Sequence, residues 1–234
     1  PIALTAFPMH GQQKLSHEGY RTRDGHFIEW FGELLSGKGP VAVRSRPEPM
    51  ILRAGARPGT VAENTIPLDS WTWRVPTLGP RQRWWWSSRN AYTDQMLTSD
   101  APIVVWNPFL GVSNLWDEIS GSSAKLAFDM LDDWTAHYAF APIKEEVELT
   151  YRRVFERADI VTANSEATLS TAQAFGRSDA ILVTNGCDPE RFDTNSSASG
   201  PLKVGYVGKI GRRVDLELVL DVSGALPDVE FVFA

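Results

Sequence analysis

The alternation of short apolar runs with segments of helical periodicity is the feature that most constrains the fold of this chain. Apolar runs typical of strands occupy residues 2–7, 41–43, 103–106, 124–128, 160–163 and 180–184. Continuous apolar strands that alternate with helices form βαβ units, whose parallel sheet is covered by helices on both faces. The sequence therefore predicts an α/β fold built on a doubly wound parallel sheet. Ligands of such a sheet bind at the carboxyl ends of its strands, and candidate site residues are sought there.

The segments between these runs carry helical patterns of varying clarity. We expect helices at 27–35, 82–97, 115–119, 144–158 and 166–175. The fourth of them begins with glutamates and ends with arginines, an order that the helix dipole favours. The stretch 44–79 is rich in proline, glycine and arginine, and its pattern leaves both irregular strands and an excursion from the fold open.

The composition argues against several classes of protein. Of the 234 residues, 43% are hydrophobic and 22% are charged, which suffices for a buried core without metals or disulfides. The net charge of −6 argues against broad nucleic-acid binding, which depends on the neutralisation of phosphates. The single cysteine, Cys187, permits no intramolecular disulfide and is interpreted as inert. We find no leader and no apolar run of about 20 residues, and expect a cytoplasmic protein with peripheral membrane contact left open.

The strand and helix pattern is interrupted once and then restarts. Residues 1–193 carry the long alternating pattern, and the segment 194–200 reads as a flexible linker of serine, alanine, asparagine and glycine. A strand at 203–207, a helix at 216–226 and a strand at 229–233 follow it. A single βαβ unit cannot bury both of its faces, so we expect 201–234 to be the beginning of a second, incomplete Rossmann-like domain.

The loop after the first strand is a candidate binding site. It contains Gly11 and leads through Arg23, Asp24 and His26 into a helix, where Thr22 or Asp24 is a natural N-cap. A glycine-containing loop before a helix N-terminus suits an anion or a network of sugar hydroxyls. The glycines lack the GxGxxG spacing, so a nicotinamide or flavin cofactor is not favoured. A capped surface loop, with His26 as a structural residue, is the alternative.

Polar residues also follow two later strands. Asn107 follows the strand at 103–106, and Asp129, Asp132 and Asp133 follow the strand at 124–128. Three interpretations of the carboxylates remain open. Asp132 or Asp133 caps the helix that carries Trp134, the carboxylates bind substrate hydroxyls beside that aromatic ring, or they bind a divalent metal through oxygen ligands.

Several motifs in the second half of the chain occur together in one known family. Asp-Ile-Val-Thr-Ala-Asn-Ser at 159–165 precedes a helix, and Asn-Gly-Cys-Asp-Pro-Glu-Arg-Phe follows at 185–192. After the linker come Gly-Tyr-Val-Gly-Lys-Ile at 205–210, Asp-Leu-Glu-Leu at 215–218 and Pro-Asp-Val-Glu-Phe-Val-Phe at 227–233. In combination, these motifs resemble the GT-B glycosyltransferases of family 4 type, from about residue 100 to the end. More weakly, the stretch Asp129–Trp134 resembles a subgroup that builds bacterial surface polysaccharides.

The resemblance implies an enzyme that moves a sugar from a nucleotide-diphosphate sugar to a saccharide or lipid-linked acceptor, in a cleft between two domains. It implies that Gly208, Lys209 and Arg213 bind the donor diphosphate, with Lys209 where arginine is more usual. The family usually retains the anomeric configuration and acts without a metal or other cofactor. Many members have a histidine at the place of Asp129.

On this basis we assign roles to the residues at the strand ends. Catalytic roles are predicted for Asp129, Asp132 and His26. Acceptor binding is predicted for Gly11, Arg23, Asp24, Asn107 and Asp133, and no metal site is expected.

Two other functions remain open. A GT-B-like sugar-nucleotide epimerase would use acidic residues and histidines in the same cleft without an acceptor. A non-catalytic domain would bind glycan or a partner through the aspartates and the run Trp84-Trp85-Trp86. Packing in the core is the first interpretation of these three tryptophans, and contact with a membrane interface or a partner is the second.

Overall fold

The structure is a computed structural model that describes residues 1–17, 19–55, 61–75, 80, 82–93, 100–186, 190, 199–208, 210–211 and 214–234. The chain divides into two compact units, Pro1–Gly186 and Cys187–Ala234. The boundary predicted at residue 193, Cys187 and most of the predicted linker lie outside the described residues.

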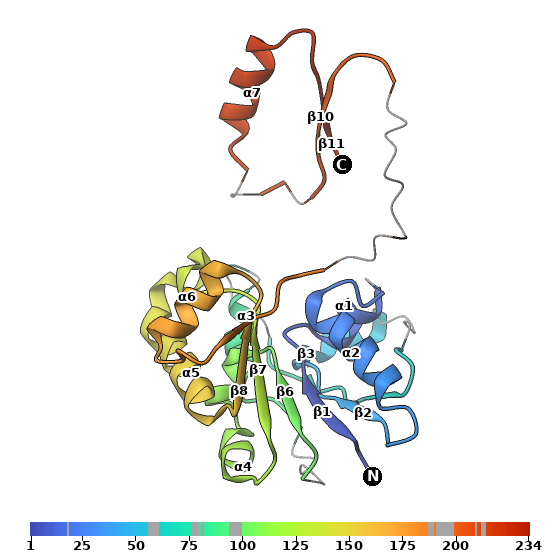
Figure 1. Ribbon diagram of the computed structural model, residues 1–234, viewed down its shortest axis with the longest axis vertical. Helices are drawn as coiled ribbons and strands as arrows, with labels where there is room; N and C mark the ends of the chain where they lie inside the picture. Colours follow the sequence, from blue (N-terminus) through green and yellow to red (C-terminus); the bar gives the residue numbers. More distant parts are fainter. Residues whose placement is uncertain are drawn as a thin grey trace. The chain divides into compact units, whose positions relative to one another are not determined.

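A seven-stranded parallel sheet forms the centre of the first unit (Figure 1). Its strands are β1 (Leu4–Phe7), β2 (Val41–Val43), β4 (Thr65–Pro67), β6 (Ile103–Val105), β7 (Leu126–Met130), β8 (Ile160–Ala163) and β9 (Ile181–Leu182). They lie in the order β4-β2-β1-β6-β7-β8-β9, and every neighbouring pair is parallel. This topology confirms the predicted doubly wound α/β fold.

The strand order reverses at β1. Ala6 of β1 pairs with Val43 of β2 on one side and with Val104 of β6 on the other. The chain winds outward from β1 in both directions, so the connections that leave the carboxyl ends of β1 and β6 turn to opposite faces of the sheet. The space between those two ends is where a doubly wound sheet binds its ligand.

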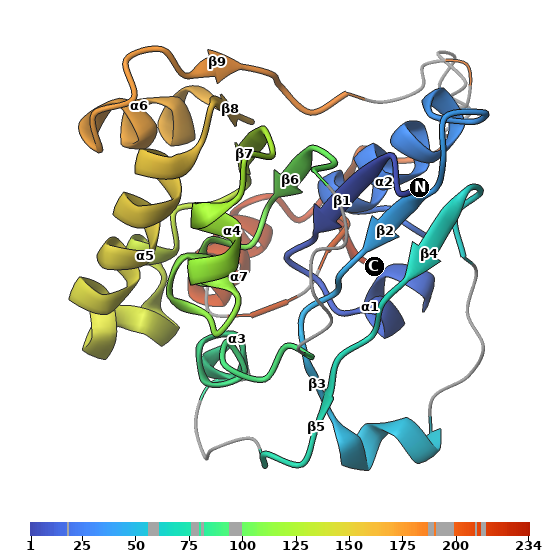
Figure 2. The same cartoon turned by 90° about the horizontal axis from the view of Figure 1, so that it is seen from below.

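Helices cover both faces of this sheet. The α-helices of the unit are α1 (Gln12–His17), α2 (Arg23–Leu34), α3 (Arg83–Ser87), α4 (Trp116–Gly121), α5 (Lys144–Arg157) and α6 (Glu166–Ala174). The 3₁₀ helices are η1 (Met50–Gly55), η2 (Pro108–Val112), η3 (Trp134–Ala136) and η4 (Tyr138–Ile143). Seen from below, α2 lies on one side of the row of strands and α4 and α5 on the other (Figure 2).

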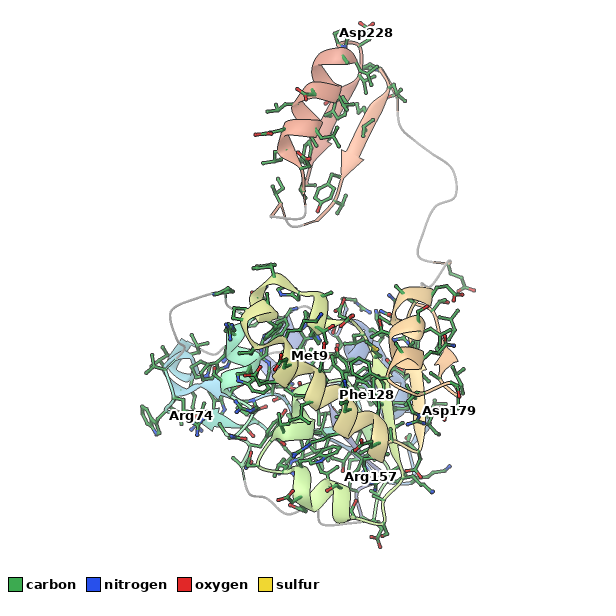
Figure 3. The ribbon with its side chains drawn as sticks, turned by 90° about the vertical axis from the view of Figure 1, so that its left-hand side faces the viewer. Met9, Arg74, Phe128, Arg157, Asp179 and Asp228 are labelled. Carbon is green, nitrogen blue, oxygen red and sulfur yellow. The ribbon has the colours of Figure 1, made fainter. Side chains whose placement is uncertain are left out.

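Aromatic side chains fill the space between the sheet and α5. Phe128 of β7 packs edge-on against Phe155 of α5, with ring centroids 5.3 Å apart, and Met9 and Phe128 both lie among the packed side chains of the unit (Figure 3). Gly111 of η2 touches α5 so closely that a Cβ atom there would lie 2.7 Å from the carbonyl oxygen of Thr150. The tight packing of η2 on α5 therefore depends on glycine at position 111.

The helix predicted at 82–97 is too long. Among the described residues of this stretch, 82–93, only α3 is an α-helix, and the next residues form a turn around Ser88. Residues 94–97 lie outside the described residues. Three consecutive tryptophans and two serines are weak helix formers, and packing decides the outcome. Trp84 is buried and donates to the carbonyl oxygen of Pro47, Trp85 packs against Trp134, and Trp86 packs against Phe109. The first interpretation of the tryptophan run, packing within the domain, agrees with these contacts.

The stretch 44–79 contains short strands, which agrees with one of the two alternatives that its composition left open. β3 (Glu48–Pro49) pairs in parallel with β5 (Trp71–Thr72), and β4 forms the edge of the main sheet. Helix α1, in the loop after β1, was not predicted. In the chain, α1 follows the carboxyl end of β1, and the stretch 44–79 follows the carboxyl end of β2.

The described residues of the second unit form the strand, helix and strand that the sequence predicts. Strands β10 (Lys203–Tyr206) and β11 (Glu230–Phe233) pair in parallel, and α7 (Leu216–Ala225) connects them. Asp215 caps α7 by accepting a hydrogen bond from the backbone N–H of Leu218 (3.0 Å). None of the residues of α7 is buried, and Leu220 is 69% exposed.

Within the described residues, no helix combines the length and the apolar character that crossing a bilayer requires.

Candidate functional site

A buried carboxylate, Asp24, organises the loop at the carboxyl end of β1. Asp24 is the second residue of α2 and is completely buried. Its Oδ2 accepts hydrogen bonds from the backbone N–H groups of Met9 (3.0 Å) and His10 (3.3 Å), and its Oδ1 accepts from the N–H of Gly25 (3.1 Å). Thr22 is the N-cap of the helix. Asp24 therefore fixes the backbone of the loop to the start of α2.

The same carboxylate orients the imidazole ring of His10. Nδ1 of His10 lies 3.0 Å from Oδ2 and 3.2 Å from Oδ1 of Asp24. Burial alone raises the pKa of a carboxyl group, but the hydrogen bonds and charge of His10, with a hydrogen bond from Thr22, hold the pKa of Asp24 below its ordinary 3.8. An ionised carboxylate only accepts hydrogen bonds, so Nδ1 carries the hydrogen and Nε2 of the neutral ring carries a lone pair.

Nε2 of His10 is available for proton transfer. The side chain of His10 is 16% exposed, and Nε2 has no hydrogen-bond partner among the described residues. A histidine whose Nδ1 is held by a buried carboxylate, and whose Nε2 is available, has the arrangement of a general base. It stands at the carboxyl end of β1, where the strand order reverses.

A second buried pair joins α2 to β7. Arg23 donates from Nε to Oδ2 of Asp129 (2.8 Å) and from Nη2 to Oδ1 (2.9 Å), with both side chains less than a tenth exposed. Trp106 Nε1 donates to Oδ2 (2.7 Å), and Thr162 Oγ1 donates to Oδ1 (2.6 Å). Asp129 lies at the end of β7 and accepts four hydrogen bonds from three side chains. The arrangement suits a residue that positions the Arg23 guanidinium.

Arg23 also reaches the loop after β9. Its Nη1 donates to Oδ1 of Asn185 (3.1 Å), and its guanidinium lies 5.0 Å from the ring centre of Phe27. Of the five N–H hydrogens of an arginine, three are thus accounted for by Asp129 and Asn185. Arg23 therefore links the α2 end of the site to the ends of β7 and β9.

The segment after β2 forms another wall of the β1 loop. Arg46 donates from Nε to the carbonyl oxygen of Met9 (3.2 Å), and its guanidinium lies 5.7 Å from the ring of Trp85. Two residues further on, the carboxylate of Glu48 lies directly against Gly11. The residues on either side of His10 are thus both in contact with the segment 46–48.

Asn107 and Asp133 organise local backbone. Oδ1 of Asn107 accepts from the N–H of Phe109 and caps η2, while its Nδ2 donates to the hydroxyl of Tyr92. Asp133 is the N-cap of η3, and its Oδ1 accepts hydrogen bonds from the N–H (2.9 Å) and from Oγ1 (2.6 Å) of Thr135. Of the three interpretations left open for the aspartates, helix capping agrees with the contacts of Asp133.

His26 contacts residues of its own helix, and the structure places Asp132 at the surface. Nδ1 of His26 lies 3.6 Å from the carboxylate of Glu29, and its ring lies near Trp30 on the same helix. Asp132 is exposed, and its carbonyl oxygen accepts from the Tyr151 hydroxyl (2.6 Å). The carboxylates of Asp129 and Asp133 have separate partners, and no group of three possible metal ligands is found among the described residues.

Of the residues predicted to bind the donor diphosphate, Lys209 and Arg213 lie outside the described residues. Gly208 has φ of 153°, which residues with a side chain rarely adopt. Its N–H donates to the carbonyl oxygen of Ala234 (3.0 Å) and continues the β10–β11 ladder.

His10 and Glu48 were not among the predicted site residues. His10 stands three residues after β1, so its position at a strand end was a signal for it. Its partner Asp24 lies 14 residues away, and only the fold of the loop shows that the two meet. Glu48 gave no signal, because it lies in the stretch whose structure the composition left open.

Comparison with known proteins gives distant similarity to solved structures. No family model matches this chain, and no curated protein matches it. Among solved structures, it is similar to the crystal structure of Arabidopsis thaliana UGT89C1 complexed with UDP-L-rhamnose, with a TM-score of 0.48 and 14% sequence identity. The similarity covers 99% of this chain and 64% of that chain. A similarity of this size assigns neither family nor function, and the fold described above rests on the sheet topology.

Proposed function

We propose that this protein contributes the acceptor-activating site of a GT-B glycosyltransferase, which moves a sugar from a nucleotide-diphosphate sugar to a hydroxyl group of a saccharide or lipid-linked acceptor. The observation that carries the proposal is the His10–Asp24 pair at the carboxyl end of β1, where the strand order reverses. The motifs between residues 159 and 233 add the resemblance to the family.

His10 acts as the general base in this proposal. Nε2 of His10 accepts the proton of the acceptor hydroxyl while the acceptor oxygen bonds to the anomeric carbon of the donor sugar. The bond from that carbon to the diphosphate breaks, and the nucleoside diphosphate leaves with the electron pair. Asp24 holds the Nδ1 tautomer and stabilises the imidazolium that forms, because the carboxylate stays ionised beside it.

Arg23 and Asp129 have a positioning role in the same proposal. The bidentate pair, with Trp106 and Thr162 on the same carboxylate, keeps the guanidinium in one place at the start of α2. Arg23 is the residue next to Asp24, so the pair also fixes the helix end on which the His10 loop depends. This replaces the direct catalytic role that the sequence analysis gave to Asp129 with an indirect one.

The donor side of the proposal rests on the resemblance. Gly208, Lys209 and Arg213 of the second unit are assigned to the diphosphate, and the reaction needs no cofactor beyond the nucleotide sugar. The resemblance of the Asp129 stretch favours bacterial surface polysaccharide or glycolipid synthesis, in the cytoplasm or at the inner face of the membrane. These assignments stay proposals for the whole protein.

The general base leads to a stereochemical expectation. A single displacement by a base-activated hydroxyl inverts the anomeric carbon, whereas the family that the sequence resembles usually retains its configuration. The test is to follow nucleoside diphosphate release by the protein of the complete gene, with wild type, His10→Gln and the exposed control His17→Gln. We expect His10→Gln to lower kcat by about 100- to 10,000-fold and His17→Gln to leave it unchanged. Equal rates in all three proteins would refute the role of His10.

A further inference from the structure

We propose that an exposed rim, formed by η1 and the segment at the end of β5, binds the surface of an anionic lipid bilayer. The rim consists of the exposed residues Ile51, Leu52, Arg53, Trp73, Arg74 and Val75. The inference goes beyond the function proposed above and does not depend on it, because binding to lipid needs no turnover of a sugar nucleotide.

Contacts within the first unit hold the two parts of the rim together. Helix η1 packs against both β3 and β5. The guanidinium of Arg53 lies 6.0 Å from the ring centre of Trp71 in β5. The backbone N–H of Arg74 donates to Oγ1 of Thr72 (3.2 Å), and its Nη1 donates to the carbonyl oxygen of Ser87 (3.4 Å). The rim is therefore attached to β5 and to α3.

Large apolar side chains of the rim stand out from the protein. Trp73 is 80% exposed, Val75 is 73% exposed and Ile51 is 66% exposed. Figure 2 shows β3 and β5 at one edge of the first unit, on the side opposite α6 and β9. Side chains that are this exposed do not line a groove that could enclose a ligand. Exposed apolar groups that gather on one part of a surface mark contact with a partner or a membrane, and tryptophan favours the boundary between hydrocarbon and water.

The stretch that contains the rim is strongly basic in an acidic protein. Residues 44–89 contain eight arginines, two glutamates and one aspartate, a net charge of +5, whereas the whole chain carries −6. Arg53 and Arg74 are exposed, and Figure 3 shows Arg74 at the edge of the first unit. Such a charge asymmetry orients the molecule toward an anionic surface. The stem of an arginine lies on apolar surface while its guanidinium meets phosphate groups.

An anionic bilayer is the partner that fits both the charge and the apolar side chains. A nucleic acid would bind the arginines but gain little from Ile51 and Val75, and the negative charge of the chain opposes it. An acidic protein would need a pocket of its own to receive Trp73. Lipid headgroups supply phosphates for the arginines, and the apolar layer directly beneath them receives the projecting side chains.

The experiment measures co-sedimentation of the protein of the complete gene with lipid vesicles. The vesicles consist either of phosphatidylcholine alone or of an equal mixture of phosphatidylcholine and phosphatidylglycerol. Two variants are compared with wild type: Trp73→Ser, and Arg53→Gln combined with Arg74→Gln. Tryptophan fluorescence in urea checks that each variant is folded.

The matched controls change exposed residues of the same kind elsewhere on the first unit. Trp30→Ser removes a tryptophan of α2 that is 52% exposed. Lys38→Gln combined with Arg152→Gln removes two exposed positive charges outside the stretch 44–89, so that the net charge changes by the same amount as in the double arginine variant.

We expect wild type to bind the mixed vesicles much more tightly than pure phosphatidylcholine, with binding that weakens as the salt concentration rises. Loss of Arg53 and Arg74 together should raise the lipid dissociation constant roughly 25-fold, or about fivefold for each charge. Trp73→Ser should raise it roughly tenfold or more, because the apolar surface of the indole no longer leaves water. Both control variants should bind like wild type.

Vesicles with brominated acyl chains test whether Trp73 itself reaches the hydrocarbon. Bromine quenches the fluorescence of tryptophans that enter the acyl region. We expect quenching in wild type that largely disappears in Trp73→Phe, which keeps an aromatic ring for binding but removes the fluorophore. Quenching of the same size in Trp73→Phe would show that another part of the protein enters the bilayer and would overturn the assignment.

Three other results would also overturn the inference. Wild type that binds neither kind of vesicle, or both equally, would remove the argument from charge. Equal binding by the rim variants and their controls would place the membrane contact elsewhere. Salt-sensitive binding to polyglutamate without binding to vesicles would identify an acidic protein as the partner. None of these results affects the transfer reaction, which is assayed separately with His10→Gln.

Discussion

Replacement of Asp24 by asparagine tests whether the loop of His10 depends on a buried negative charge. The carboxylate accepts hydrogen bonds from the N–H groups of Met9, His10 and Gly25 and from Nδ1 of His10. These donors lie around both of its oxygens. An asparagine keeps one acceptor oxygen and turns an NH₂ group toward the donors on the other side.

The loss of folding stability in Asp24→Asn can be estimated from these contacts. Hydrogen bonds to a charged group contribute about 1.5–3 kcal/mol each, and a buried donor left without an acceptor costs about 1–3 kcal/mol. Asp24→Asn loses at least one acceptor and all of the charge assistance. We therefore expect the free energy of unfolding of the first unit to fall by roughly 2–4 kcal/mol.

Tryptophan fluorescence measures this change in the first unit. All nine tryptophans lie at or before residue 134, within Pro1–Gly186. Urea titration followed by this signal therefore reports the first unit in the full chain. Asp117→Asn, an exposed change on α4, is the control and should stay within about 0.5 kcal/mol of wild type. An Asp24→Asn protein as stable as this control would refute the argument.

The lowered pKa of Asp24 also predicts how the stability difference between wild type and Asp24→Asn changes with pH. The pKa of Asp24 is lowered in the folded protein, so its carboxylate stabilises the fold fully above the ordinary pKa of 3.8. That contribution is lost as the pH falls from the ordinary value toward the lowered one. The difference between wild type and Asp24→Asn should be fully present above the ordinary pKa and shrink below about pH 4. A difference that grows on acidification would contradict this.

Two further changes are measured by the same titration. Asp129→Asn breaks the bidentate pair with Arg23 and should cost about 3–5 kcal/mol, because a guanidinium is left partly unpaired in a buried site; a loss below 1 kcal/mol would show that the pair is dispensable. Gly111→Ala brings a Cβ atom within 2.7 Å of the Thr150 carbonyl oxygen and should cost about 1–3 kcal/mol, whereas Gly121→Ala should stay within about 0.5 kcal/mol of wild type. Equal stability of the two glycine variants would contradict the close contact of η2 and α5.

The parts of the fold that local patterns determine were predictable. The apolar runs located every strand of the main sheet except β4, and the predicted helix at 144–158 corresponds to α5. Such runs are buried on both faces of the sheet, so their hydrophobicity is continuous and easily recognised. Ser165 is the N-cap of α6, with the reciprocal hydrogen bonds to Thr168 that its position at the helix start favours.

The parts that depend on contacts between distant segments were not predictable. The sequence left open whether Thr22 or Asp24 is the N-cap of α2. In the structure Thr22 is the N-cap, and Asp24 binds the backbone of the β1 loop instead. Nothing local to Asp24 shows that the loop of His10 folds onto it. Likewise, Asp129 looked like a member of an acidic cluster until the fold brought Arg23 onto it, across 106 residues of sequence.

The most direct test of the account is to identify the product of the reaction. The protein of the complete gene is incubated with a nucleotide-diphosphate sugar and a panel of saccharide acceptors, and acceptor masses and linkage configuration are determined by mass spectrometry and NMR. We predict acceptors that gain one sugar in inverted configuration, a reaction that is lost in His10→Gln and kept in His17→Gln. Unchanged nucleotide sugar with every acceptor, or the same product yield in His10→Gln, would contradict the proposed function.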